Sequence, residues 1–209
     1  MTSTEPRRLA VVVARHSARS GAPPGIEADA FARACLVDSY EVLADLLEVT
    51  SGIASTDARD QELLWPGSVQ LDGSMTLQHL AGQLQGHWDE VVFVPGDVPD
   101  LPGLVLAKIF KALQRADVCV APERGQGQGC AALGVRLPWP AWITGELDLD
   151  LDRDPLLELR SRSPHRTAVA VAPDWHRLRT PAAVQRLDPG LEGWDATRAL
   201  LGGHVLAVE

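Results

Sequence analysis

Uninterrupted apolar segments rich in β-branched residues recur along the chain, and segments with helical periodicity separate them. The clearest apolar runs are residues 9–14 and 91–94, which contain no polar residue. Strands buried on both faces are typical of parallel sheets covered by helices on each side. The alternating order therefore predicts an α/β fold, a three-layer α/β/α sandwich with a mainly parallel, mixed sheet. The helical segments between the runs are residues 26–47, 75–85 and 101–114.

Length and composition fit one globular domain spanning residues 1–209, with residues 1–7 as a disordered extension. The formal net charge of −9 argues against broad binding to nucleic acid or to an anionic membrane, but it leaves a local basic pocket open. No apolar run is long enough to span a membrane. The three cysteines are widely spaced, which favours free thiols and a cytoplasmic location over a disulfide framework.

Two aspartates follow the apolar run at residues 91–94. Asp97 comes directly after a Pro-Gly break, and Asp100 precedes an amphipathic helical segment. Ligands of open α/β sheets bind outside the carboxyl ends of the strands, where strands turn into helices. A carboxylate at that place can hold a hard divalent cation, which in turn neutralises phosphate oxygens. The alternative is that Asp97 caps a turn and Asp100 a helix.

The loop after the first predicted strand is rich in Ser, Gly, Pro and Arg. In an α/β sheet this first loop often contacts phosphates or nucleotides. Arg15 and Arg19 are its candidate nucleotide-binding residues. A solvated loop without a ligand is the alternative.

Three glycines at alternate positions mark a second candidate loop, at Gly125, Gly127 and Gly129. Glycine lets the backbone approach a ligand closely and adopt positive φ angles. Backbone amides of this loop could therefore line a nucleotide. The spacing is not a dinucleotide-binding fingerprint and no Walker lysine follows, so a flexible loop between two strands remains the alternative.

Acidic residues occupy every second position from Glu146 to Asp154, with leucine between them as far as Asp152. Alternation of this kind is typical of a half-buried edge strand. The acids could also form an opportunistic cation site, although their spacing does not match an EF-hand loop.

Taken in order, these segments resemble the nucleotide-diphospho-sugar transferase superfamily, also called the GT-A-like fold. The closest similarity is to the bacterial radical-SAM-associated glycosyltransferases. Their motif Gly-(Ser/Asp)-Asp-x-Pro-x-Leu is similar to Gly96-Asp97-Val98-Pro99-Asp100-Leu101 here. Ala121-Pro122 and the glycine loop after it are similar to their later strand and turn. Residues 179–184 stand where that family has Asp-Thr-Pro-x-Asp-Leu. A weaker similarity extends to phospholactate guanylyltransferases.

The chain departs from this pattern at several positions. The family's first loop carries a Lys-Thr-Arg motif, for which only Arg15 and Arg19 could substitute here. The aspartate expected before Thr180 is Arg179. Asp97 is therefore the only clear metal carboxylate of the pattern, and the source of a second metal ligand is open.

The resemblance implies a nucleotide-dependent transferase that moves a glycosyl or nucleotidyl group from an activated nucleotide or nucleotide sugar. Asp97 would hold Mg²⁺ or Mn²⁺, with Asp100 as a second catalytic residue, and the cation would offset charge on the departing phosphate. The alternative is a non-catalytic nucleotide-binding or regulatory relative with a degenerate active site, because fold does not fix function. The sequence also leaves open whether the protein forms a homodimer.

Overall fold

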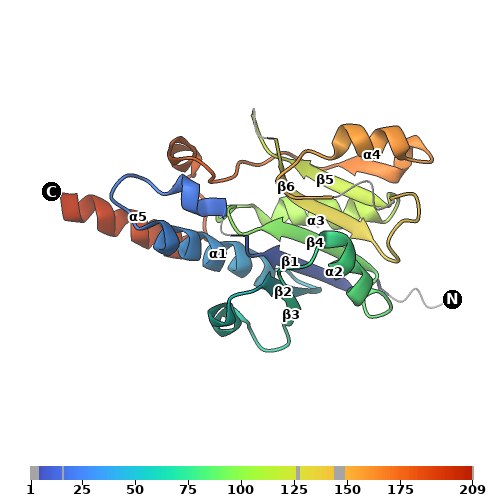
Figure 1. Ribbon diagram of the computed structural model, residues 1–209, viewed down its shortest axis with the longest axis horizontal. Helices are drawn as coiled ribbons and strands as arrows, with labels where there is room; N and C mark the ends of the chain where they lie inside the picture. Colours follow the sequence, from blue (N-terminus) through green and yellow to red (C-terminus); the bar gives the residue numbers. More distant parts are fainter. Residues whose placement is uncertain (1–4, 16, 126–127, 144–148, 209) are drawn as a thin grey trace.

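A computed structural model describes residues 5–15, 17–125, 128–143 and 149–208, with side chains as far as residue 202. Its described residues form a seven-stranded sheet in the order β3-β2-β1-β4-β6-β5-β7 (Figure 1). The strands are β1 Arg8–Val13, β2 Val49–Ser55, β3 Val69–Asp72, β4 Glu90–Pro95, β5 Val118–Pro122, β6 Cys130–Arg136 and β7 Val169–Val171. The α-helices are α1 Ala28–Ala44, α2 Leu77–Leu84, α3 Gly103–Leu113, α4 Leu156–Arg162 and α5 Asp195–Val208. The 3₁₀-helices are η1 Ser17–Gly21, η2 Ala58–Leu63, η3 Arg166–Ala168 and η4 Pro181–Arg186.

The sheet is mixed because β6 runs antiparallel to both of its neighbours, β4 and β5. The other pairings are parallel, including β1 with β4 and β5 with β7. Strands β1, β4 and β5 therefore end at one edge of the sheet, which is called the carboxyl edge below. The predicted α/β sandwich with a mainly parallel, mixed sheet is confirmed.

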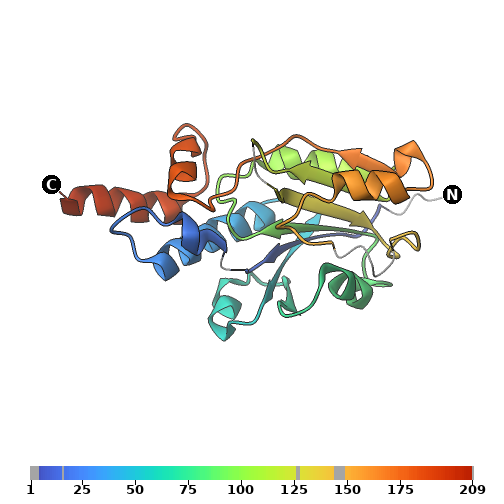
Figure 2. The ribbon, with the colours of Figure 1, turned by 45° about the horizontal axis from the view of Figure 1, so that its top comes forward.

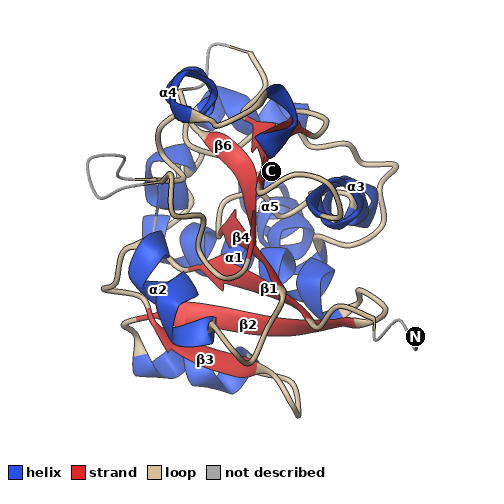
Figure 3. Cartoon of the chain, turned by 90° about the vertical axis from the view of Figure 1, so that its right-hand side faces the viewer, coloured by secondary structure: helices blue, strands red, loops and turns tan. Residues whose placement is uncertain are grey.

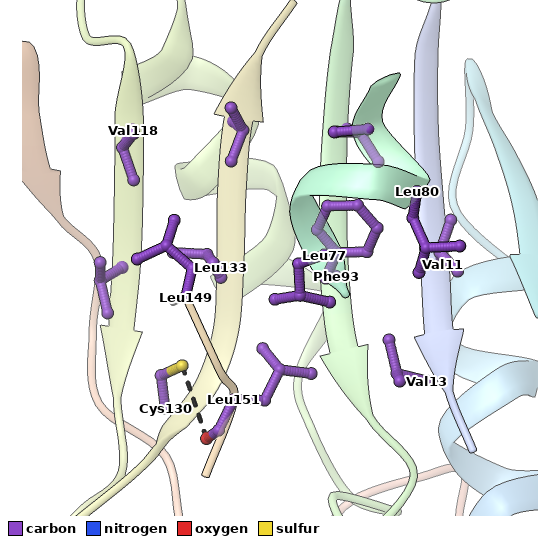
Figure 4. Close-up of a cluster of buried hydrophobic side chains, with 14 of the residues drawn as sticks. Val11, Val13, Leu77, Leu80, Phe93, Val118, Cys130, Leu133, Leu149 and Leu151 are labelled. Carbon is purple, nitrogen blue, oxygen red and sulfur yellow. Dashed lines mark hydrogen bonds between the residues drawn. The ribbon is translucent and has the colours of Figure 1, made fainter. Parts of the chain in front are cut away.

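Side chains of each strand alternate between two hydrophobic layers, as the period of a strand requires. In β4, Val91 and Phe93 pack with α2 and α4, whereas Val92 and Val94 pack with α1 and α3. Figure 3 shows α2 and α3 on opposite sides of the sheet. In Figure 4, Leu77 and Leu80 of α2 lie over Phe93 and Val11.

A third, smaller cluster packs outside the sheet. It joins the first half of α1 with η1, η4 and α5, through residues that include Phe31, Cys35, Leu178 and Trp194. Helix α5 lies alongside α1 at the end of the molecule opposite the N-terminus (Figure 1, Figure 2). Among the described residues, no helix has both the length and the apolar character that crossing a membrane requires.

The predicted edge strand in the acidic, leucine-alternating segment is wrong for its described part, since residues 149–155 form turns and irregular backbone. Residues 144–148 lie outside the described part of the chain. Leu149 and Leu151 are nonetheless buried, with Leu149 beside Leu133 and Leu151 beside Cys130 (Figure 4). The physical reason is that β6 already has a strand on each side, and the described part of the acidic segment meets it at Cys130, the first residue of β6. The Cys130 amide donates to the Leu151 carbonyl at 2.9 Å.

Candidate functional site

The segment that follows β7, residues 172–179, crosses the carboxyl edge of the sheet and is called the crossing segment. Backbone hydrogen bonds hold it in place at successive points. The amide of Trp175 donates to Pro122 O at the end of β5, at 3.1 Å, and the amide of Leu178 donates to Asp97 O beyond β4, at 2.8 Å. These bonds bring Arg177 directly to the Asp97 side chain.

Asp97 and Arg177, which are 80 positions apart in the sequence, form a buried, bidentate ion pair. Arg177 Nε lies 2.7 Å from Asp97 Oδ1, and Nη2 lies 2.8 Å from Oδ2. Ser17 donates its hydroxyl to the same Oδ2 at 2.6 Å. Asp97 is 0% exposed and Arg177 2%. Both oxygens of the predicted metal ligand are thus already bound within the chain.

The rest of the guanidinium faces main-chain and hydroxyl oxygens. Nη1 donates to Leu151 O at 2.6 Å and to Cys130 O at 3.4 Å, while Nη2 also reaches Ser17 Oγ at 3.5 Å. Burial alone would lower the pKa of Arg177, but the charge and hydrogen bonds of Asp97 and the charge of Asp152 outweigh it and raise the pKa above its ordinary value. Arg177 is therefore a permanently charged part of the interior.

Two further acidic residues contact the arginines on the outer side of this pair. Asp152 Oδ1 lies 2.8 Å from Arg177 Nη2 and 3.5 Å from Arg179 Nη1. Arg179 also pairs with Glu123, which is largely buried. Asp152 retains 38% side-chain exposure. A half-exposed carboxylate thus bridges two guanidinium groups.

Gly129 makes this arrangement sterically possible. A Cβ at this position would lie 2.6 Å from Leu151 O and 2.9 Å from Arg177 Nη1, closer than real Cβ contacts. Its amide donates to Glu123 Oε2 at 3.3 Å. The glycine is therefore needed for the approach of the arginines, and its amide already has a partner within the protein.

The two arginines, with Asp152 and Glu123, border a pocket of about 700 Å³ at the carboxyl edge, called the arginine pocket below. Its volume lies within the range of small-molecule sites, about 300–1,000 Å³. Among the described residues, three arginines and two carboxylates face it. Arg186 at its rim is exposed and has no ion pair within the described part of the chain. The lining residues are Ser17, Ser20, Glu123, Gln128, Asp152, Arg177, Arg179, Thr180, Ala183 and Arg186.

Asp100 lies apart from the arginine pocket and borders a second hollow. Its Oδ1 accepts a hydrogen bond from Trp175 Nε1 at 3.1 Å. Nε2 of His176 is also 3.1 Å from Oδ1, but the two are not aligned for a hydrogen bond. Asp100 Oδ2 and His176 Nε2 are buried and have no hydrogen-bond partner among the described residues.

The second hollow, of about 610 Å³, is called the acidic hollow. Asp38 in its wall accepts the amides of Ala196 and Thr197 at 2.9 and 2.7 Å, and so caps the N-terminus of α5. Burial raises the pKa of Asp38, and hydrogen bonds from Thr197 only partly offset this effect. The acidic residues that line the acidic hollow are Asp38, Glu41, Asp45, Asp100, Glu192 and Asp195.

The remaining predicted nucleotide-binding residues are scattered. Arg15 Nη1 lies 2.5 Å from Asp150, and Arg19 pairs with Asp29 beside a different hollow. Gly125 has a φ of +88°, and a Cβ there would meet no atom within 4 Å. Gly127 lies outside the described residues. The structure brings Asp97 and Gly129 together around Arg177, and the assigned roles of all these residues stay predictions.

Sequence reasoning did not identify Arg177, Arg186 or Ser17 as site residues. It placed Asp152 only in an opportunistic cation site, and it treated Arg179 only as a departure from a pattern. One signal was available. The loop after a late parallel strand must reach the carboxyl edge, and this loop carries arginines at alternate positions, 177 and 179.

The residues present do not fit a divalent cation at Asp97. The Arg177 guanidinium and the Ser17 hydroxyl occupy both carboxylate oxygens. Within the described ranges, no group of three or more His, Cys, Asp or Glu side chains could hold a metal ion. The chemistry of this edge, as folded, is that of guanidinium groups and carboxylates.

Comparisons with known proteins give likeness of fold. No protein-family model and no curated protein matches the sequence. Solved structures do match. A candidate nucleotide-diphospho-sugar transferase from Desulfovibrio desulfuricans G20 superposes with a TM-score of 0.70 at 18% identity, over 97% of each chain.

Two further solved structures cover nearly the whole chain. The 4-diphosphocytidyl-2C-methyl-D-erythritol synthase of Anaerococcus prevotii DSM 20548 has a TM-score of 0.59 at 12% identity, over 93% of this chain and 95% of its own. Rv0371c of Mycobacterium tuberculosis H37Rv, solved in complex with manganese, has a TM-score of 0.50 at 14% identity, over 95% and 100%. The chain therefore has the α/β fold of nucleotide-diphospho-sugar transferase-like proteins and cytidylyltransferases.

Proposed function

We propose that the protein binds a nucleotide or a nucleotide sugar in the arginine pocket, with the phosphate groups against the arginines. One observation carries this proposal. A chain with a net charge of −9 gathers Arg177, Arg179 and Arg186 around one hollow at the carboxyl edge of its sheet. That edge is where ligands of open α/β sheets bind.

The geometry of the pocket suits phosphate oxygens. Guanidinium groups bind carboxylates and phosphates through the same planar, two-pronged contacts. Asp152 already places a carboxylate oxygen near both Arg177 and Arg179. Because Asp152 is partly exposed, a phosphate group could displace it and contact the same two guanidinium groups. Arg186 at the rim adds a cation without a carboxylate partner in the described residues.

The first test is a binding measurement with a panel of nucleoside diphosphates, nucleoside triphosphates and nucleotide sugars. A ligand of the folded state raises the melting temperature, and calorimetry then gives its Kd. We expect Arg186→Ala to weaken binding about tenfold, the equivalent of about 1.4 kcal/mol, because one charged contact to phosphate is lost.

Arg166→Ala is the matched control, since Arg166 is an exposed arginine of η3 that borders none of the pockets described above. It removes the same charge from the molecule without touching the arginine pocket. Equal loss of affinity in both variants would show that only overall charge matters. No melting shift with any member of the panel would rule out the proposed function.

Group transfer is the second candidate, and one observation favours it. The Arg177 guanidinium stands at the place where the sequence predicts a cation, and fixed cations can stabilise charge on a departing phosphate. A transferase without its acceptor should slowly hydrolyse a bound nucleotide sugar, with water taking the glycosyl group. Release of nucleoside diphosphate that is slower in Arg186→Ala at the same subsaturating substrate concentration would support transfer, whereas binding without turnover favours the non-catalytic relative.

The panel also separates the finer families that the sequence resembles. If the resemblance to radical-SAM-associated glycosyltransferases extends to the ligand, this protein should prefer nucleotide sugars. Phospholactate guanylyltransferases imply a preference for guanosine triphosphate. The rank order of Kd values across the panel is the measurement that decides between them.

A further inference from the structure

The guanidinium of Arg177 is surrounded by oxygen atoms. It donates five hydrogen bonds, to Asp97 Oδ1 and Oδ2, Ser17 Oγ, Leu151 O and Cys130 O. A sixth oxygen, Asp152 Oδ1, forms an ion pair at 2.8 Å. Carboxylate, hydroxyl and carbonyl oxygens are also the ligands that hard divalent cations prefer.

We propose that Arg177 is a built-in replacement for a divalent cation at Asp97, so that the arginine pocket binds its phosphate-bearing ligand without metal. The part that concerns the ligand rests on the proposed function. The part that concerns the metal rests on the geometry of Arg177 alone and can be tested without any nucleotide.

The Arg177 guanidinium meets the same electrostatic demand at Asp97 as a metal cation would. Asp97 is 0% exposed, and a buried carboxylate needs a compensating charge. Arg177 supplies it through two short contacts of 2.7 and 2.8 Å. No unbound oxygen of Asp97 is left to attract a metal ion.

The contacts of Arg177 also fix its side chain in this position. Its side chain is 1% exposed, and its donors are matched to fixed oxygens of β6, the 149–155 segment and η1. A metal ion could bind Asp97 only by displacing this buried charge from all its partners. Breaking a buried pair in this way leaves an uncompensated charge, which is strongly unfavourable.

Arg177 also makes a contact on the side of the arginine pocket. Nη2 is shared between Asp97 Oδ2, on the buried side, and Asp152 Oδ1, which belongs to a residue lining the pocket. A metal ion bridging a buried carboxylate and a phosphate has the same two neighbours. Arg177 therefore links Asp97 to the ligand position as a cation would, but through a covalently attached charge that chelators cannot remove.

The test on the unaltered protein is a nitrogen–proton NMR spectrum with increasing Mn²⁺. A paramagnetic ion at Asp97 would broaden the Leu178 amide signal, because that amide donates to Asp97 O at 2.8 Å. We expect this signal to stay as sharp with Mn²⁺ as with diamagnetic Mg²⁺, up to millimolar concentrations. Selective broadening of the Leu178 amide at substoichiometric Mn²⁺ overturns the proposal.

A variant gives the converse result. Arg177→Ala leaves Asp97 and Asp152 facing a common point, beside Ser17 Oγ and Leu151 O. We expect this variant to gain Mn²⁺ binding, seen as a rise in melting temperature or in refolding yield with Mn²⁺, while the unaltered protein shows neither. A folded Arg177→Ala protein that does not bind Mn²⁺ contradicts the proposal.

The same experiments distinguish this inference from the proposed function. Where a nucleotide binds, its Kd should be unchanged within about twofold between chelator and Mn²⁺. A nucleotide that binds only with Mn²⁺ overturns the inference and leaves the proposed function standing. If no nucleotide binds, the proposed function fails, and the metal measurements still decide the role of Arg177.

Discussion

The arginine pocket and the acidic hollow lie near the same edge of the sheet and have similar volumes, about 700 and 610 Å³. They differ in how the carboxylate of the neighbouring aspartate is paired. Asp97 has every oxygen paired with Arg177 or Ser17, whereas Asp100 keeps one buried oxygen without a partner among the described residues. Only three positions separate the two residues, so the difference comes from what the rest of the chain brings to each.

The comparison shows that an aspartate's place at the strand end does not fix its chemistry. The crossing segment brings a guanidinium to Asp97 but Trp175 and His176 to Asp100. In the acidic hollow, burial and then the charges of Asp38, Asp195 and Asp45 raise the pKa of Glu41. The arginine pocket pairs its carboxylates with arginines, whereas the acidic hollow accumulates negative charge.

The largest effect should come from breaking the balance in the arginine pocket. We expect Arg177→Ala to lower the free energy of unfolding by about 3–5 kcal/mol without metal, because it leaves Asp97 charged and buried. Urea unfolding followed by circular dichroism measures the change. Arg166→Ala, on the surface, should stay within about 0.5 kcal/mol of the unaltered protein. A loss below about 1 kcal/mol in Arg177→Ala would mean that Asp97 finds another partner.

The next largest effect should come from the acidic hollow. Asp38→Ala removes both side-chain acceptors from the N-terminus of α5, and we expect a loss of about 0.5–2 kcal/mol. Helical signal in the far-ultraviolet spectrum should fall with it as α5 frays. Glu192→Ala, an exposed residue of the same hollow, is the control and should leave both quantities unchanged.

A smaller effect should sharpen the contrast in ligand preference. Asp152→Asn removes the carboxylate that faces Arg177 and Arg179, so phosphate groups no longer compete with it. We expect pyrophosphate to bind about three- to tenfold more tightly, on the order of 1 kcal/mol, by calorimetry. Asp154→Asn changes the same charge outside the pocket and should have no effect. Weaker binding in Asp152→Asn would place the ligand elsewhere.

The smallest effect is a pH dependence that belongs to the acidic hollow. The pKa values of Asp38 and Glu41 are raised above their ordinary values of 3.8 and 4.5, mainly by burial. The folded state therefore holds their protons to higher pH than the unfolded chain does. Their stabilising contribution is complete below about pH 4 and is lost as the pH rises through the folded pKa values.

Asp38→Asn removes one of these titrations. The stability of the variant relative to the unaltered protein should therefore increase between about pH 4 and pH 7. Urea unfolding at several pH values measures this difference. A constant difference across the range would show that Asp38 titrates alike in the folded and unfolded states.

Much of the fold could be predicted because its signals are local. The apolar runs of β1 and β4 have no polar residue, so their burial on both faces follows from the sequence alone. The edge strand predicted in the acidic segment is wrong for its described part, residues 149–154. Its alternation does bury Leu149 and Leu151, but whether it pairs depends on whether β6 has a free edge, which is a property of the whole sheet.

The site was less predictable because its central contact is not local. That Asp97 lies at the carboxyl edge follows from the strand before it. Its partner Arg177 lies 80 residues later, and its bonds depend on the path of the crossing segment. The sequence pattern singled out Asp97 and Gly129, but no local rule pairs either of them with a particular arginine.

The way Arg177 is held has a consequence for which substitutions the chain can tolerate there. Its five hydrogen bonds leave through three nitrogens in a rigid plane, toward oxygens of several separate segments. A lysine keeps the charge but offers one nitrogen with three hydrogens. It could replace at most three of these five hydrogen bonds, so at position 177 an exchange that looks conservative by charge still alters the interior.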